Sequence, residues 1–250
     1  MNVRTVDASH GWRWIAHGFA IFRKSPALWV LLLAVLFVGS RLLFALPLVG
    51  VIVVLVAPNF LAGLVHGAQA LEHGKPLRFG YLASGFLKNA PQLITIGGVS
   101  LIGQFLTLMA MVVVGGDAIG DISRSLSVGP TSPEAIEAVR AAAPRMMMAM
   151  LVGLGLSLPL MMAVWFAPLL VFFDDVSPWA AIVLSLWACL KNVLPMLVYS
   201  TAVLVPTLAL TPVSIALRQP DLGLWLLAPA LVPSIYASYR DLFVREGPAA

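Results

Sequence analysis

Six long apolar runs constrain this chain more than any other feature of its sequence. Each has roughly 18 residues or more, enough for a helix to cross a hydrocarbon layer about 30 Å thick. Backbone polar groups cannot stay unpaired in lipid, so membrane-spanning segments form helices or closed barrels. The runs lack the two-residue alternation of barrel strands, so we predict an all-α polytopic membrane protein with six transmembrane helices. The runs cover approximately 27–46, 48–71, 91–114, 146–172, 194–216 and 222–243.

The composition agrees with a membrane location. Hydrophobic residues make up 60% of the chain and charged residues only 10%, whereas soluble domains carry about 25% charged residues. Cys189 is the only cysteine, which excludes an internal disulfide and a metal site built from several cysteines. The sequence contains no phosphate-binding loop, serine elbow or histidine–carboxylate motif. We therefore expect no catalytic residues, no cofactor and no bound metal.

Basic residues divide unequally between the two predicted sides of the membrane. Six spans put both termini on one side, and that side has ten Lys and Arg residues against four on the other. Because basic loops favour the cytoplasmic side, we predict a bacterial inner-membrane protein with both termini cytoplasmic. The net charge of +4 mostly reflects this asymmetry, and it favours anionic lipid over nucleic acid as a partner.

A short basic phrase recurs in front of three of the apolar runs. Its copies are Phe22-Arg23-Lys24-Ser25-Pro26, Leu87-Lys88-Asn89-Ala90-Pro91 and Leu190-Lys191-Asn192-Val193-Leu194-Pro195. Apolar residues at helical spacing precede each copy, as in Trp12, Ile15, Phe19 and Phe22. The pattern predicts three related hairpins, each preceded by an amphipathic elbow helix lying in the membrane interface. The alternative is that these segments are continuous N-terminal extensions of the spanning helices.

The repeats define the predicted organisation of the chain. A tail over 1–9 precedes a single membrane domain over 10–244, and a second tail covers 245–250. The repeats in this domain are 10–73, 78–175 and 176–244. The second contains an insertion at 115–145, interpreted as an outward-facing hairpin or lid, in which Ser132-Pro133-Glu134 is typical of a short helix start.

Small residues and prolines suggest where the helices pack and bend. An Ala-Pro pair returns late in each repeat and predicts related kinks at Pro58, Pro168 and Pro229. The alternative is that prolines are simply common in membrane helices. Gly63 and Gly67 form a small-xxx-small pattern that lets another helix approach closely, either in this chain or in a second protomer.

Few polar residues interrupt the runs. Arg41 lies five residues before the end of its run, so it either reaches the interface or faces the protein interior. Gln104 is a candidate for a polar contact between helices. Asp174 and Asp175 precede Ser177-Pro178. Their negative charges are expected to favour the positive N-terminal end of the next helix. The histidines, interpreted as interfacial residues with a metal site as the alternative, are His10, His17, His66 and His73.

The chain resembles a family of uncharacterised six-helix inner-membrane proteins from proteobacteria, over roughly residues 10 to 244. That family is distantly similar to the membrane domain of some glycerophosphodiester phosphodiesterases. The resemblance implies a fold, with no established activity to transfer. It rests on Gly11-Trp12-Arg13-Trp14, Lys24-Ser25-Pro26, Asp174-Asp175-Val176-Ser177-Pro178-Trp179, Leu190-Lys191-Asn192 and Tyr236-Ala237-Ser238-Tyr239-Arg240-Asp241.

These observations favour a non-enzymatic protein that binds lipid, as a scaffold or as an accessory subunit of a membrane complex. Its partners would be anionic lipids and either another membrane protein or further copies of itself. The alternative is a passive channel or a lipid or small-solute transporter with a cavity between the hairpins, to which Arg41 and Gln104 would contribute. The predicted headgroup-binding residues are Arg23, Lys24, Arg78, Lys88 and Lys191.

Overall fold

The structure is a computed structural model in which two compact units are defined. The first unit combines Met1–Gly98 with Met162–Ala250, and the second unit is Val99–Met161. The described residues are 2–44, 47–116, 118, 120, 133–219 and 222–244.

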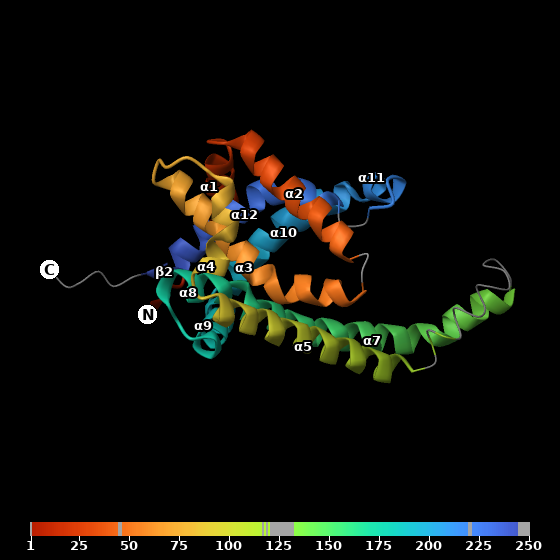
Figure 1. The fold of residues 1–250 in the computed structure, drawn as a ribbon. Helices are drawn as coiled ribbons and strands as arrows, with labels where there is room; N and C mark the ends of the chain where they lie inside the picture. The colour runs from red at the N-terminus through yellow and green to blue at the C-terminus, as the bar shows by residue number, and fades with distance from the viewer. Residues whose placement is uncertain are drawn as a thin grey trace. The chain divides into compact units, whose positions relative to one another are not determined.

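Helices dominate both units (Figure 1). In chain order the elements are β1 (Asn2–Val3), α1 (Ser9–Phe22), α2 (Pro26–Phe44), α3 (Pro47–Glu72), η1 (Phe79–Ala83), α4 (Ser84–Leu87), α5 (Ala90–Gly115), α7 (Pro133–Trp165), α8 (Ala167–Asp174), α9 (Pro178–Lys191), α10 (Val193–Ala209), α11 (Thr211–Ala216), α12 (Leu222–Leu242) and β2 (Phe243–Val244).

The described residues contain five helices long and apolar enough to cross a membrane, or six if the bent pair α9–α10 counts as one span. They correspond closely to the predicted runs, because a run of apolar residues is a local property of the sequence. Two runs are each divided between two helices: the fourth, 146–172, between α7 and α8, and the fifth, 194–216, between α10 and the short α11. The prediction of a helical membrane protein is confirmed, whereas the six-helix count and the threefold repeat stay predictions.

A helix ends at each copy of the basic phrase. α1 ends before Arg23, α4 ends before Lys88, and α9 ends at Lys191. Between α9 and α10 the chain bends by 88°. This bend excludes a continuous helix through the third copy. Placement of the elbows in the membrane interface stays a prediction.

The second elbow differs from the other two because it contains no full amphipathic helix. It consists of the 3₁₀ helix η1 and the single turn α4. A Cβ on Gly85 would lie 2.1 Å from the carbonyl oxygen of Asn59. The elbow therefore packs backbone against backbone on α3, which only a glycine at this position permits.

Helix α1 packs closely against α12 and α10 in the first unit. Trp14 and Ile21 are buried on this face. A Cβ on Gly18 would meet the backbone of Ser234 at 2.5 Å, so the two helices touch directly. On the opposite face Trp12 is 60% exposed and Phe19 49% exposed. α1 thus has one apolar face inside the protein and another on its outer surface.

The predicted kinks lie in different surroundings. Pro58 and Pro229 are inside α3 and α12. Pro168 is instead in the first turn of α8, directly after a break at Phe166. The Ser185 hydroxyl accepts from the Phe166 amide at 2.9 Å and donates to the Met162 carbonyl at 2.6 Å, so it satisfies backbone groups exposed by the break.

A short antiparallel strand pair joins the two ends of the first unit. Asn2 pairs with Val244, and Val3 pairs with Phe243. The all-α expectation omits this pair because two-residue strands leave no periodic pattern in the sequence. The N-terminal segment is therefore attached to the end of α12.

The second unit contains most of α5 and α7, which run side by side (Figure 1). A Cβ on Gly103 would lie 2.6 Å from Leu160, so α5 and α7 approach closely there. The predicted start at Pro133 is present, but it opens a helix of 33 residues rather than a short separate one. Asp117 and Asp121 of the predicted lid lie outside the described residues.

Candidate functional site

The five predicted headgroup-binding residues lie at the ends of the elbows, and all are on the surface. Two of them also have partners in the protein. The Lys24 ammonium donates to the Leu71 carbonyl at 3.0 Å, and Lys88 pairs with Asp175 at 3.2 Å. Lys191 lies 5.1 Å from the centre of the Trp187 ring. Arg23 and Arg78 are exposed.

Asp175 forms a small polar cluster with the second elbow. The Asn89 amide donates to Asp175 at 2.8 Å and to the Val171 carbonyl at 2.8 Å. The hydrogen bond from Asn89, together with the nearby Lys88 ammonium, holds the pKa of the Asp175 carboxyl below its ordinary value. Tyr239 donates its hydroxyl to Asp174. Each carboxylate thus bonds to another element, and the expectation that both aspartates favour the start of α9 stays a prediction.

The two polar residues predicted within the spans contact their own helices. The Arg41 guanidinium lies 5.2 Å from the centre of the Phe37 ring, in the last turn of α2. Gln104 donates to the Ser100 hydroxyl at 2.9 Å, one turn earlier in α5. Gln104 therefore bonds along its helix in this structure rather than to another one.

Gly63 and Gly67 face a neighbour in the same chain. A Cβ on Gly63 would lie 2.4 Å from the Tyr81 carbonyl oxygen, and one on Gly67 would lie 2.7 Å from Leu77. These glycines are approached by the second elbow itself, at Tyr81 in η1, and by Leu77 just before it. Asn59 continues the contact, because its amide donates to the Gly85 carbonyl at 2.8 Å.

The four histidines fall into two groups. His66 contacts the Ser84 hydroxyl at 3.0 Å, and His73, directly after α3, contacts the Gln69 carbonyl of that helix at 2.7 Å. His10 and His17 instead bind carboxylates at the ends of distant spans. No group of three His, Cys, Asp or Glu side chains suited to a metal ion occurs within the described ranges.

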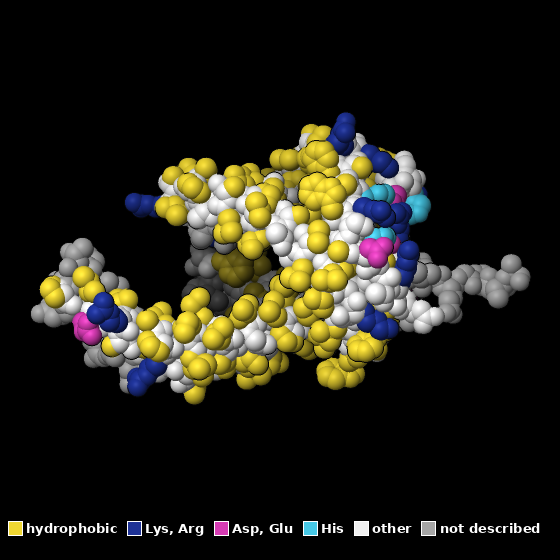
Figure 2. All heavy atoms as spheres, turned by 180° about the vertical axis from the view of Figure 1, so that it is seen from behind, with side chains coloured by type: hydrophobic (Ala, Val, Ile, Leu, Met, Phe, Trp, Pro, Cys, Tyr) yellow, Lys and Arg dark blue, Asp and Glu magenta, His cyan; other side chains and the backbone are white. Residues whose placement is uncertain are grey.

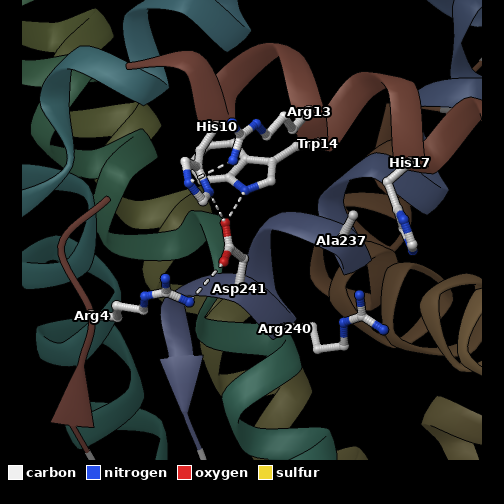
Figure 3. Close-up of a pocket in the computed structure, with 8 residues that line it drawn as sticks. All are labelled: Arg4, His10, Arg13, Trp14, His17, Ala237, Arg240 and Asp241. Atoms are coloured by element: carbon white, nitrogen blue, oxygen red, sulfur yellow. Dashed lines mark hydrogen bonds and ion pairs between the residues drawn. The ribbon is translucent and has the colours of Figure 1, made fainter. Parts of the chain in front are cut away.

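Two further polar clusters lie next to each other in the first unit, and Asp241, near the end of α12, is the centre of the first. His10 Nδ1 lies 2.6 Å from one of its oxygens, and the Trp14 indole N–H donates to that oxygen at 2.8 Å. Arg4 donates to the other oxygen at 3.4 Å (Figure 3). Three segments of the chain thus meet at one carboxylate.

Glu72, the last residue of α3, is the centre of the second cluster. Its Oε1 lies 2.7 Å from His17 Nε2 and 2.5 Å from a nitrogen of Arg240. Arg240, which binds Glu72, immediately precedes Asp241 in the sequence, so the two clusters are adjacent. Figure 2 shows charged and histidine side chains together at this end of the first unit.

Asn192 attaches the N-terminal segment to this region. Its amide oxygen accepts from the Val6 backbone at 2.9 Å, and its amide nitrogen donates to the Arg4 carbonyl at 3.0 Å. Asn192 is itself buried and also donates to the Ala188 carbonyl. The asparagine of the third basic phrase therefore positions Arg4 near Asp241.

A pocket of about 310 Å³ lies between α1, the end of α12 and the N-terminal segment. A second pocket of about 370 Å³ adjoins it at Glu72 and Arg240. Figure 3 shows Arg4, His10 and Asp241 on one side of the first pocket and His17 and Arg240 on the other. The side chains lining the first pocket are Arg4, His10, Arg13, Trp14, His17, Ala237, Arg240 and Asp241.

The sequence analysis did not identify the carboxylates of these clusters as site residues. The paired residues are far apart in the chain: His10 and Asp241 are separated by 231 in residue number, and His17 and Glu72 by 55. The available signal was the seven-residue spacing of His10 and His17, which places both on one face of α1. The matching signal was a carboxylate at the end of a predicted span on the same side of the membrane, such as Glu72 or Asp241.

Comparison with known proteins supports the membrane location. A curated protein of Burkholderia thailandensis, named as a probable inner membrane protein, is 26% identical over 266 residues. The match covers 100% of this chain and 97% of that protein. No family model and no solved structure matches the chain.

The fold and this relative support a helical inner-membrane protein. The expected resemblance to an inner-membrane family agrees with the relative. The more distant likeness to phosphodiesterase membrane domains and the cytoplasmic placement of both termini stay predictions.

Proposed function

We propose that this chain is a non-enzymatic integral inner-membrane protein that binds anionic lipid headgroups. It would serve as a scaffold or as an accessory subunit of a membrane complex. The observation that carries the proposal is the two-faced α1, which ends at the basic pair Arg23-Lys24. Its inner face is packed in the first unit, while Trp12 and Phe19 are exposed on its other face. An exposed aromatic face beside basic residues suits the boundary between acyl chains and headgroups.

Helix α9 has the same combination of features. Ala181 and Ser185 are buried, whereas Trp179 is 73% exposed and Trp187 is 52% exposed. Lys191 lies at the end of this exposed face. Tryptophan is enriched where membrane meets water, because its ring is apolar and its N–H is polar.

The contributions of the five basic residues should be unequal. Lys88 is paired with Asp175, and Lys24 donates to a backbone carbonyl, so part of their capacity is used within the protein. Arg23, Arg78 and Lys191 have exposed side chains. A basic residue near an anionic surface contributes about 1 kcal/mol, so we expect these three to dominate.

Thermal unfolding in nanodiscs tests the proposal. The wild type should unfold at a higher temperature in phosphatidylglycerol than in phosphatidylcholine, because binding to the folded state raises apparent stability. Replacing Arg23, Lys24, Arg78, Lys88 and Lys191 by glutamine should remove most of this difference. The control is the double replacement Arg140→Gln and Arg145→Gln in α7.

Equal unfolding temperatures of the wild type in both lipids would contradict the proposal. So would a control that loses as much of the difference as the fivefold variant. Solute flux through proteoliposomes would favour the channel or transporter alternative instead. Crosslinking in native membranes would identify a partner subunit or a second copy of the chain.

A further inference from the structure

The first pocket has more positive than negative groups. Three guanidinium groups line it, from Arg4, Arg13 and Arg240, against the single carboxylate of Asp241. Counting Glu72, which binds Arg240 from the second pocket, still leaves one positive charge in excess. His10 and His17 add ring nitrogens to the same lining. A basic pocket between helices is suited to a small anion.

Arg13 has N–H donors that are available to bind a ligand. Its contact in this cluster is with His10 Nε2 at 3.4 Å, and within the described part of the chain it bonds to no carboxylate. Arginine can only donate, so Nε2 of His10 accepts and Nδ1 carries the proton donated to Asp241. Arg13 has five N–H donors in a planar fork, and a long bond to an imidazole uses few of them.

The other two guanidinium groups are held in place by the protein. The Arg4 guanidinium donates to Asp241 at 3.4 Å, and the Asn192 amide binds the Arg4 backbone. Glu72 binds the Arg240 side chain. Ala237, on α12, contributes only a methyl group to the lining. Positions fixed before binding reduce the entropy lost when a ligand is bound.

We propose that the pocket between α1 and the end of α12 binds a phosphate group through Arg13, Arg4 and Arg240. The phosphate belongs either to a free phosphate ion or to a phospholipid headgroup. Arginine suits this ligand because its fork matches two oxygens of a phosphate at once. A pocket of about 310 Å³ is at the small end of ligand sites, so it fits a compact anion. The inference does not rest on the lipid-surface proposal, whose five basic residues are all different.

Binding of two soluble probes to the full-length protein in a maltoside detergent tests the inference. The probes are inorganic phosphate, followed by phosphorus NMR line broadening, and dihexanoyl phosphatidic acid, followed by native mass spectrometry. We expect one or both to bind and Arg13→Gln to weaken binding about tenfold or more, the loss of a charge-assisted hydrogen bond. Arg13→Lys, which keeps the charge without the fork, should lose less. Arg140→Gln is the control for loss of one arginine outside the pocket.

The two probes separate the sources of the phosphate. Binding of inorganic phosphate alone identifies a free anion as the ligand, and binding of phosphatidic acid alone identifies a headgroup. Failure of both probes to bind would overturn the inference, as would an equal loss in Arg140→Gln. Circular dichroism and gel filtration of Arg13→Gln establish that the variant is folded. Since neither probe needs a membrane surface, these results are independent of the nanodisc experiment.

Discussion

Asn89 has a backbone conformation that few residues adopt. Its φ is 56°, in the left-handed region, and it directly precedes α5. Its side chain also bonds to Val171 and Asp175, so one residue both turns the chain and attaches the end of α8. Asparagine suits both tasks because it tolerates this conformation better than most residues and carries an amide donor.

Replacing Asn89 separates these two contributions. Asn89→Gly keeps the left-handed conformation accessible but removes both hydrogen bonds, each worth about 1 kcal/mol. Asn89→Ala removes the same bonds and adds strain of about 1 kcal/mol. We expect both variants to unfold more easily in detergent, and the alanine variant more so. Equal stability of the two would show that the backbone conformation contributes little.

Asp175 provides a test by pH. The lowered pKa means that the folded state favours the charged carboxylate. Its stabilising contribution is therefore present above the ordinary pKa of 3.8 and is lost as the pH falls through the lower folded value. Asp175→Asn should lower the unfolding temperature at pH 7, with a difference from wild type that shrinks below pH 3.8. A difference that does not depend on pH would exclude the charge as its cause.

At the scale of elements, α1 depends on close contact with α12. A Cβ on Gly18 would lie 2.5 Å from the backbone of Ser234, which cannot move aside as a flexible side chain can. Gly39 in α2 is the natural comparison, because a Cβ there meets nothing within 4 Å. The two glycines thus differ in surroundings while both are within helices.

Gly18→Ala should lower the free energy of unfolding by about 1–3 kcal/mol, because the added methyl group overpacks the contact between the helices. Gly39→Ala should be neutral or stabilising by up to about 1 kcal/mol, since alanine is the better helix former. Unfolding of both variants in detergent measures the difference. If Gly18→Ala is as stable as Gly39→Ala, α1 is not packed on α12 as described.

Local features of this fold could be predicted from the sequence and distant contacts could not. The apolar runs and the basic phrases define where α2, α3, α5 and α12 begin, because span length and turn chemistry are properties of adjacent residues. The bonds of His10 to Asp241 and of Asn192 to the N-terminal segment depend on how separate helices pack. No spacing in a single sequence specifies such pairs, so the pocket they form required the structure.

At the scale of the whole molecule, the strand pair constrains how the chain crosses the membrane. Asn2 is paired with Val244, so the two ends of the described chain lie next to each other, as the prediction of both termini on one side requires. Five crossings would separate the ends, whereas an even number brings them together. The bent pair α9–α10 is the candidate for the additional crossing, with α10 entering the membrane after the 88° bend.

Reporter fusions at the two termini test this topology. With six crossings, a reporter active only in the cytoplasm should give the same result at either end, and the basic bias predicts activity at both. A reporter placed after Ala209, between α10 and α12, should give the opposite result, because α10 would have carried the chain across. The matched control is a fusion after Lys191, which should agree with the termini because α9 precedes the crossing. If the fusions after Lys191 and Ala209 agree with each other, α10 does not cross, and the strand pair between Asn2 and Val244 would be incompatible with the remaining five spans.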